Sequence, residues 1–238
     1  MTTGLLAAAQ PLTMRARLRH ATADLLPRKI LVRRVAGAAR RVALTFDDGP
    51  DDMTDGYLEV LQRFGVRVTF FVVGRECAQR PDVLARIVSH GHEVAGHGFT
   101  HRRFPELDAA SLYGELGQTA RLLPGSPSAR TMVRPPHGTT SIRSLLRCWN
   151  AGYTTVLWSK DSDDCRTSAA DVVEANLTPE RLVPGDIVLL HEGQSWTLAA
   201  LPGVLQRLKD AGIETVPVSE LLGSACSNPG NGTARPPG

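Results

Sequence analysis

Short apolar runs alternate with longer amphipathic stretches along most of the chain. The runs are rich in β-branched residues and show little alternation of apolar and polar positions, which is typical of strands buried on both faces. They cover residues 42–46, 68–72, 93–95, 132–134, 154–158, 187–190 and 214–216. The stretches between them carry apolar residues at helical spacing. These predicted helices cover residues 54–64, 81–90, 108–123, 141–150, 169–177, 198–210 and 219–222.

Local signals support the predicted helix ends. Asp108 and Ser141 stand where an N-cap residue is expected. Glycines follow four of the helices, where a left-handed residue commonly ends a helix: Gly65, Gly91, Gly152 and Gly212. Because neighbouring parallel strands need crossover helices, the repeated units predict an α/β fold, a closed or nearly closed (β/α) barrel of about seven parallel strands. A doubly wound open sheet is the alternative, since one sequence does not reveal strand order.

Basic residues are concentrated near the N-terminus. Residues 14–41 hold nine Arg or Lys residues and one Asp, a net charge of +8, whereas the rest of the chain carries −5. We interpret residues 1–41 as a basic leader with interleaved apolar residues, among them Leu31 and Val32. It either contacts an anionic membrane surface or is a solvated arm. A nucleic-acid partner is not expected, because the leader lacks aromatic stacking residues.

Composition indicates one globular domain. The chain has 238 residues, 42% of them hydrophobic, and no run approaches the roughly 20 apolar residues that span a bilayer. The apolar start is interrupted by Gln10 and Pro11, so it does not predict a secretory signal, and we expect a cytoplasmic location. Residues 224–238 are rich in Gly, Pro, Ser and Asn and predict a disordered tail. The cysteines form no C-x-x-C pair and are expected to be free thiols: Cys77, Cys148, Cys165 and Cys226.

Residues with chemically useful side chains fall just after the predicted strands. The carboxyl ends of barrel strands meet at one face, which is where catalytic groups of such folds lie. A random scatter of polar residues would not concentrate there, so the pattern predicts an active site. The residues are Asp47, Asp48, His97, His101, Arg134, Asp161, Asp164 and His191.

His97 and His101 are four residues apart. On a helical turn this spacing places two imidazoles on one face, close enough to share a metal ion. By itself the spacing is weak evidence, because a solvent-facing pair explains it equally well. Gly96 and Gly98 favour a specially shaped loop over a regular helix.

Asp47 and Asp48 follow a hydrophobic strand and precede a Gly-Pro turn. Neighbouring carboxylates there would point in different directions, so one could bind a metal while the other stayed free. A turn-forming role is the alternative, because Asp before Gly-Pro is common in turns. The two interpretations are compatible.

Taken together, these motifs resemble those of the polysaccharide deacetylases with a NodB homology domain, a carbohydrate esterase family. Residues 45–50 match the first motif of that family in full. The second to fifth motifs are resembled, in the same order, by residues 97–101, 134–138, 161–164 and 189–191. Five ordered motifs are highly specific, and they predict a deacetylase domain over residues 42–223.

The resemblance implies a distorted (β/α) barrel and a divalent metal, usually zinc. Carried over by position, Asp48, His97 and His101 are the metal ligands. Two histidines and one carboxylate also suit iron, cobalt or nickel, so the ligand types do not fix the metal.

The resemblance also assigns roles in amide hydrolysis. Asp47 would be the general base and His191 the general acid. Asp161 would pair with His191 and keep it protonated, while Arg134 would position the Asp47 carboxylate. A carboxylate can take a proton from water and an imidazolium can give one to the leaving amine, so these residue types suit the reaction.

Three positions depart from the family pattern. Gly98 replaces a Ser or Thr, which removes a hydroxyl that could brace the metal loop. His137 replaces an aromatic residue, whose backbone N–H is thought to serve the oxyanion, so the substrate-facing surface is altered. Cys165 replaces a Trp and removes an apolar wall. Trp196 could stack on a sugar ring, with a partly buried structural role as the alternative.

These residues predict a metal-dependent hydrolase that removes an N-acetyl group from an amino sugar, possibly one linked to a lipid or another carrier, and releases acetate. An esterase or amidase acting on another acetylated carbohydrate or glycosylated metabolite is the alternative within enzymes. A non-catalytic carbohydrate-binding barrel is the alternative outside them.

Overall fold

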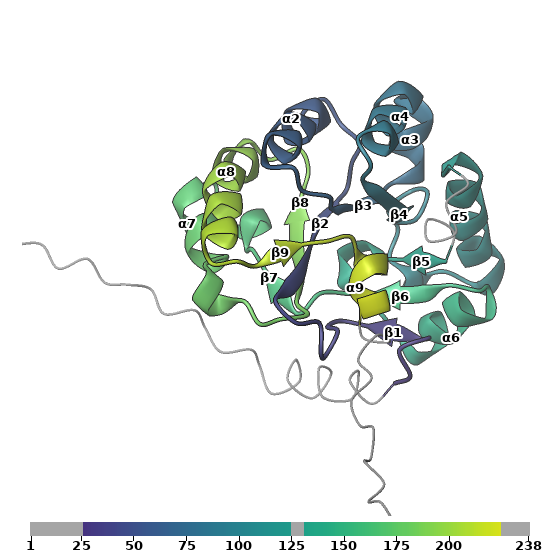
Figure 1. The fold of residues 1–238 in the computed structure, drawn as a ribbon. Coiled ribbons are helices and arrows are strands. Elements are labelled where there is room, and N and C mark those ends of the chain that lie inside the picture. Colours follow the sequence, from purple (N-terminus) through teal and green to yellow (C-terminus); the bar gives the residue numbers. More distant parts are fainter. Residues whose placement is uncertain (1–25, 125–130, 225–238) are drawn as a thin grey trace, which may run out of the picture.

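A curled parallel sheet forms the centre of the molecule (Figure 1). The computed structural model describes residues 26–124 and 131–224. The sheet runs in the order β1-β6-β5-β4-β3-β2-β8-β7, and β9 pairs with β2 outside this path. The strands are β1 Leu31–Val32, β2 Arg41–Asp47, β3 Thr69–Val72, β4 Glu93–Gly96, β5 Met132–Val133, β6 Thr154–Val156, β7 Lys160–Asp161, β8 Ile187–His191 and β9 Glu214–Thr215. The predicted barrel of parallel strands is confirmed.

The barrel is distorted where the chain passes from β6 to β7. We predicted a single strand over residues 154–158, but the structure divides this stretch. β6 pairs with β5 and β1, and β7 pairs with β8. Leu157 N–H donates to the carbonyl of Val32, whereas Ser159 N–H donates to that of Ile187. One stretch of chain therefore joins the two sides of the barrel by changing partners between these residues.

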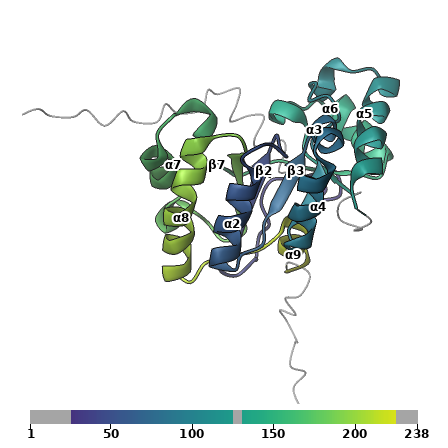
Figure 2. The same ribbon diagram turned by 90° about the horizontal axis from the view of Figure 1, so that it is seen from above.

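Helices cover the outside of the sheet, as Figure 2 shows for α2, α4, α7 and α8. Their bounds lie within three residues of the predicted ones, and α3 was not predicted. The helices are α2 Thr54–Phe64, α3 Gly74–Gln79, α4 Pro81–Ser89, α5 Ala109–Leu122, α6 Ile142–Asn150, α7 Ala170–Asn176, α8 Ser195–Asp210 and α9 Val218–Ser224. Short 3-10 turns are η1 Phe104–Glu106, η3 Pro136–Gly138, η4 Asp164–Arg166 and η5 Pro179–Arg181.

Local capping explains several helix ends. The side chain of Asp108 accepts a hydrogen bond from Ser111 N–H at the start of α5. Ser141 and Ser144 form a reciprocal capping box at the start of α6. Gly65 ends α2 in the left-handed conformation, with φ of 64°. Asp108 and Ser141 therefore give α5 and α6, the two helices that follow site loops, a defined start.

The two faces of each strand have different partners. On β2, Val42, Leu44 and Phe46 pack in one cluster with apolar side chains of α2 and α8. Ala43 belongs to a second cluster, with Phe71, Ala95, Val156 and Ile187 of other strands, which is the inside of the barrel. Because side chains alternate along a strand, Asp47 faces the inside as Ala43 does, at the carboxyl end of β2.

The folded domain begins before residue 42, so the predicted boundary of the leader is wrong. Leu31, Val32, Val35 and Ala38 are all buried. Val35 N–H donates to the carbonyl of Gly185. Gly185 has φ of +89°, and a Cβ atom on this residue would lie only 1.8 Å from the carbonyl oxygen of Val35, so there is no room for a side chain. The sheet, not a membrane, buries Leu31 and Val32. Residues 1–25 and 225–238 lie outside the described residues, so most of the leader and the predicted tail do too.

Candidate functional site

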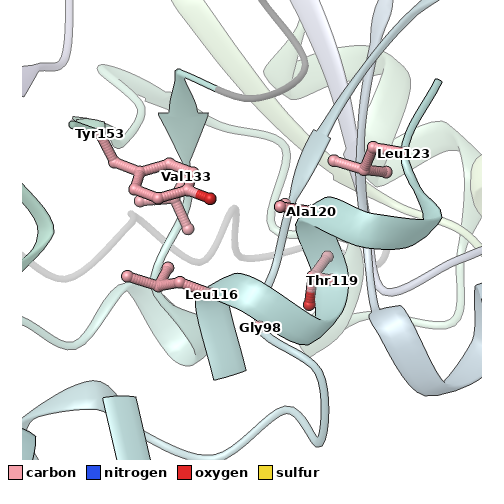
Figure 3. Close-up of a pocket in the computed structure, with 8 residues that line it drawn as sticks. Gly98, Leu116, Thr119, Ala120, Leu123, Val133 and Tyr153 are labelled. Carbon is pink, nitrogen blue, oxygen red and sulfur yellow. The ribbon is translucent and has the colours of Figure 1, made fainter. Parts of the chain in front are cut away.

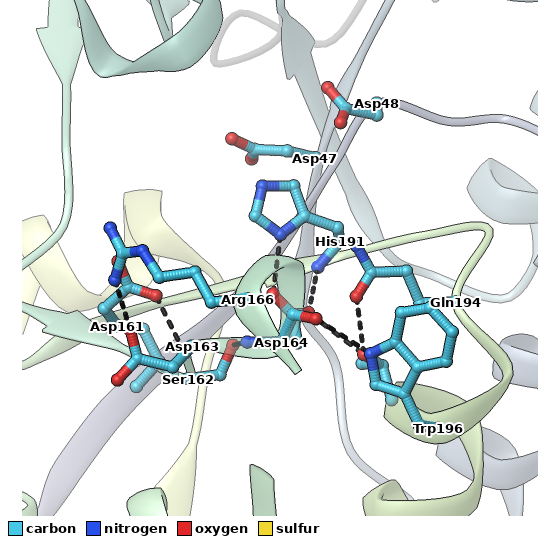
Figure 4. Close-up of polar contacts among 12 residues, drawn as sticks. Asp47, Asp48, Asp161, Ser162, Asp163, Asp164, Arg166, His191, Gln194 and Trp196 are labelled. Atoms are coloured by element: carbon cyan, nitrogen blue, oxygen red, sulfur yellow. Dashed lines mark hydrogen bonds and ion pairs between the residues drawn. The ribbon is translucent and has the colours of Figure 1, made fainter. Parts of the chain in front are cut away.

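Asp47 and His191 lie side by side at the carboxyl ends of neighbouring strands. They are register partners in the pairing of β2 with β8. In-register residues of parallel strands point to the same face of a sheet, so both side chains belong to the inner face. Figure 4 shows the His191 ring beneath Asp47 and Asp48. The backbone alone thus brings the expected base and the expected acid together.

Arg134 holds the carboxylate of Asp47. Its Nη1 donates to Asp47 Oδ1 at 2.6 Å and to Thr45 Oγ1 at 2.8 Å. The guanidinium is fully buried and lies 3.9 Å from the centre of the Phe71 ring. Its burial lowers the pKa of Arg134, while the charge of Asp47 opposes that shift. One Asp47 oxygen is therefore fixed, and Oδ2 is turned toward His97, with Nε2 at 3.7 Å.

Asp48, His97 and His101 gather at the same end of the barrel. Asp48 Oδ1 lies 3.4 Å from His97 Nε2 and 3.0 Å from His101 Nε2. His97 Nδ1 lies 2.8 Å from the carbonyl oxygen of Arg134. A carbonyl can only accept, so Nδ1 carries the proton of neutral His97 and Nε2 keeps its lone pair. Burial would raise the pKa of Asp48, but contacts with His101 and His97 outweigh it and hold this pKa well below its usual range.

These three residues fit a divalent cation. One donor atom from each lies within 4.8 Å of the other two. His101 Nε2 is buried, and Asp48 Oδ1, 3.0 Å away, is not placed to form a well-aligned hydrogen bond with it, so no residue that the structure describes satisfies this nitrogen. A buried nitrogen without a partner is costly unless it binds something else, and metal-bound histidines usually donate their other nitrogen as His97 does. The donor set and its surroundings therefore match a site with three protein ligands.

The expected pairing of Asp161 with His191 is wrong. Asp164 Oδ1 lies 2.7 Å from His191 Nδ1, and Asp164 Oδ2 accepts the backbone N–H of His191 at 2.8 Å (Figure 4). Asp161 instead accepts the N–H of Asp163 and faces Arg166 at 3.8 Å. The left-handed turn at Asp163, with φ of 59°, brings Asp164 rather than Asp161 under the imidazole.

Asp164 is fully buried and sits in a dense set of hydrogen bonds. Thr197 Oγ1 donates to its Oδ2 at 3.0 Å, and Trp196 Nε1 donates to its carbonyl at 2.8 Å. Burial lowers the pKa of His191, but the hydrogen bond and charge of Asp164 outweigh burial and raise that pKa to about 9. His191 is therefore protonated at neutral pH, as a general acid must be.

The two expected substrate contacts differ in their surroundings. Trp196 is half-buried, packs against the core and supports Asp164, which favours the structural alternative. His137 is exposed, and its ring lies 4.6 Å from that of His101, centre to centre. The structure therefore leaves only His137 of the two open to solvent beside the candidate metal ligands.

Glu115 is a site residue that the sequence did not reveal. This acid on α5 is buried, with an exposed fraction of 7%. Its Oε2 accepts hydrogen bonds from the N–H groups of Phe99 and Thr100 at 2.6 and 2.7 Å. The Thr100 hydroxyl donates to its Oε1. Gly98 has φ of +78°, a conformation that disfavours any residue with a Cβ atom. The hydroxyl that Gly98 lacks is not needed to brace the loop, because Glu115 holds the next two residues. Its position on the buried face of α5 was the only available signal.

Glu192 is a second acid that the motifs missed. It is 4% exposed and follows His191 directly. Thr54 Oγ1 donates to its Oε1 at 2.5 Å, and Oε2 has no hydrogen-bond partner within the described part of the chain. Burial raises the pKa of Glu192 to about 8, so the group is largely neutral at pH 7. Its carboxyl group occupies the space where a side chain at Gly49 would lie.

Backbone strain is concentrated in the site loops. Among the described residues, five that are not glycine have positive φ, and four of them belong to these loops: Asp48, His101, His137 and Asp163. Each such conformation costs on the order of 1–3 kcal/mol and persists only where the surroundings enforce it. The loops are therefore held in a shape that local preference alone would not select.

A separate small cavity lies between α5 and the sheet (Figure 3). Its volume is about 10 Å³, and its lining includes Leu116, Ala120, Val133 and Tyr153. That is about the volume available to a single water molecule. A cavity of this size is too small for a sugar.

Comparisons with known proteins identify the relatives of this chain. The family model described as polysaccharide deacetylase matches residues 34–156. The chain is 32% identical over 202 residues to the peptidoglycan-N-acetylglucosamine deacetylase PgdA of Listeria monocytogenes, covering 83% of this chain and 42% of that protein. It is 36% identical to a chitooligosaccharide deacetylase of Sinorhizobium fredii, covering 76% of this chain and 91% of the relative.

A solved structure gives the same picture. The Bc1960 peptidoglycan N-acetylglucosamine deacetylase superposes with a TM-score of 0.77 at 26% identity, over 82% of this chain and 93% of that one. The chain spans less than half the length of the Listeria relative. The sequence motifs, the barrel and these similarities lead to one conclusion: the chain belongs to the polysaccharide deacetylase family.

Proposed function

We propose that this protein is a metal-dependent N-deacetylase that hydrolyses the acetamide of an N-acetylated amino sugar and releases acetate. One observation carries the proposal: Asp47 and His191 lie in register beside three convergent candidate ligands, Asp48, His97 and His101. Amide hydrolysis needs a base and an acid on either side of a polarised carbonyl. This arrangement supplies both on one face of the barrel.

Asp47 suits the role of general base. Arg134, which also donates to the hydroxyl of Thr45, fixes the position of Asp47, and its guanidinium engages only Oδ1. Asp47 Oδ2 would accept the proton of the attacking water. The chemistry that a divalent cation would supply, held by Asp48, His97 and His101, is polarisation of the acyl oxygen and a lower pKa for water.

His191 suits the role of general acid. Asp164 accepts from Nδ1 and keeps the ring protonated, which leaves Nε2 free to donate. The departing amine needs a proton because an amide anion is a poor leaving group. A donor near pKa 9 holds its proton at neutral pH yet transfers it to the more basic nitrogen.

The substrate class rests on the relatives. The names of those relatives specify peptidoglycan N-acetylglucosamine and chitooligosaccharides, both polymers of N-acetylated amino sugars. We propose a glycan of this kind, either free or linked to a lipid or another carrier, as the substrate. The exposed His137 replaces the aromatic residue expected at the site, so a distinct preference for chain length or linkage is expected.

The experiment is acetate release by the full chain reconstituted with Zn²⁺, Co²⁺ or Ni²⁺. Substrates are N-acetylglucosamine oligomers, a lipid-linked N-acetylhexosamine and acetylated xylan, which tests the esterase alternative. The variants Asp47→Asn and His191→Ala should lose activity by at least about 100-fold, as expected for a lost acid or base. Protein that binds metal but releases no acetate from any substrate would support the non-catalytic alternative.

The cytoplasmic location and the membrane contact of the leader stay predictions. Within the described residues no helix is long and apolar enough to cross a membrane. Membrane contact would depend on leader residues other than Leu31 and Val32, which are buried. Co-sedimentation of the full chain with anionic phosphatidylglycerol vesicles at low salt tests this, and an absence of binding rejects it.

A further inference from the structure

We propose that Asp164, Cys165 and His191 form a second metal site, which takes a thiophilic divalent cation such as Zn²⁺ or Cd²⁺ and switches off the general acid. The binding proposal is independent of the proposed function. Only its inhibitory consequence rests on that function. The site involves none of the candidate ligands at the first centre.

Donor geometry is the first argument. One ligand atom from each of Asp164, Cys165 and His191 lies within 4.8 Å of the other two. Cysteine sulfur, imidazole nitrogen and carboxylate oxygen are all zinc ligands, with bonds of about 2.0–2.3 Å. Cys165 is exposed, so a change of its rotamer can close the remaining distance. A water molecule can complete four-coordination.

Preorganisation is the second argument. Asp164 and His191 are already in contact at 2.7 Å, and Thr197 and Trp196 hold Asp164 in place. A cation at this position would replace the proton shared between Asp164 Oδ1 and His191 Nδ1. Only Cys165 must become ordered when the cation binds.

Charge is the third argument. Asp161 and Asp163 lie beside Asp164, and Arg166 pairs with both of these neighbours. Three carboxylates face one guanidinium and one imidazolium, so the local net charge is negative. A negative local charge favours binding of a cation at this position.

Binding would release one proton from the Cys165 thiol and one from the His191 imidazolium. No bond other than these S–H and N–H bonds is broken, and no group is oxidised or reduced. With the cation on Nδ1, His191 keeps its Nε2 proton but is a neutral imidazole, which is a far weaker proton donor than the imidazolium. Excess zinc would therefore inhibit the protein at a site separate from the one that activates it.

The binding test uses the full chain, stripped of metal and titrated with Cd²⁺. Thiolate-to-cadmium charge transfer absorbs in the ultraviolet and reports sulfur binding without any activity assay. We expect two cadmium ions per wild-type chain, one of them with this absorption. Cys165→Ser should lose that absorption and weaken the second binding step by at least about tenfold.

Cys226→Ser is the matched control, because Cys77 and Cys148 are buried and Cys226 is the remaining cysteine of the chain. It should behave as the wild type does. Charge-transfer absorption that persists in Cys165→Ser, or its absence from the wild type, would overturn the proposal.

The functional test compares activity at one equivalent of Zn²⁺ with activity in excess Zn²⁺. The activity in excess Zn²⁺, divided by the activity at one equivalent, should be far below one in the wild type and near one in Cys165→Ser. Equal inhibition of both proteins would overturn the inhibitory role. If no deacetylase activity is found at all, the cadmium titration still decides whether the site exists, so failure of the two proposals can be told apart.

Discussion

At the residue scale, the carboxylate that contacts His191 determines the protonation state of the His191 ring. Asp164 is fully buried and contacts both the ring and the backbone of His191, whereas Asp161 contacts neither. Within the motif Asp161-Ser162-Asp163-Asp164 the sequence offers three acids, and spacing does not distinguish them. Substitution of Asp164 and of Asp161 by asparagine separates their roles.

Asp164→Asn should lower the pKa of His191, because it removes the charge that opposes the effect of burial. In the wild type, kcat/KM should fall as pH rises through about 9, where His191 loses its proton. In the variant that alkaline limb should move to lower pH. Asp161→Asn is the control and should leave the limb in place. A titration of the His191 ring by NMR in metal-free protein gives the same comparison without turnover.

Glu192→Gln should change how stability depends on pH. The pKa of Glu192 rises from about 4.5 in the unfolded chain to about 8 in the folded one. Between these values the unfolded chain ionises while the folded one does not, so this residue lowers stability as pH rises. At about 1.4 kcal/mol per pKa unit, the loss amounts to a few kcal/mol by pH 8.

Glutamine can still accept the bond from Thr54 but does not ionise. Urea unfolding with a chelator present, at pH 5 and pH 8, should show the variant gaining on the wild type at the higher pH. A stability difference that is the same at both pH values would contradict the assigned pKa.

At the element scale, α5 acts as a support for the loop that carries His97 and His101. Glu115 accepts three hydrogen bonds from that loop, and Asp108 fixes the start of the helix. The loop itself includes a residue with positive φ at Gly98 and another at His101. A strained loop of this kind keeps its shape only if the element behind it does.

Glu115→Ala should therefore weaken zinc binding without removing a ligand. The variant leaves the N–H groups of Phe99 and Thr100 without their acceptor, and loss of a residue that orients a ligand typically costs 10–100-fold in affinity. Competition with a chromophoric chelator measures the change. Glu106→Ala, which removes an exposed acid from the nearby η1 turn, is the matched control and should bind zinc normally. Unchanged affinity in Glu115→Ala would show that the loop is rigid by itself.

At the scale of the whole molecule, residues 31–38 complete the barrel. Leu31 and Val32 pair with β6, and Val35 and Ala38 join the inner cluster. The family model begins at residue 34, inside this segment. The segment therefore belongs to the domain although its charge suggested a separate leader.

A chain that begins at residue 42 should be much less stable than one that begins at residue 26. Each of the larger buried side chains contributes about 1.5–3 kcal/mol, and total stability is typically only 5–15 kcal/mol. Urea unfolding followed by circular dichroism measures the difference. The chain from residue 26 keeps every described contact and serves as the reference. Equal stability of the two chains would mean that the segment only lies on the barrel.

Much of the fold could be predicted because its signals are local. Strand and helix patterns depend on nearest neighbours along the chain, and the caps at Asp108 and Ser141 were found for that reason. The short β1 was missed because a run of three apolar residues between Lys29 and Arg33 is too short to show a periodicity. The division of residues 154–158 was missed because it depends on partners distant in sequence, Val32 and Ile187.

The site divides in the same way. The sequence by itself determined the alternating strands and helices of a parallel α/β fold, the residues at the strand ends and, by resemblance, the family and its barrel, because residue type and order carry that information. The tertiary structure decided which acid supports His191, that Trp196 braces Asp164, and that Glu115 and Glu192 belong to the site. These features depend on turn geometry and on contacts between distant elements, which set distances that spacing along a chain does not encode.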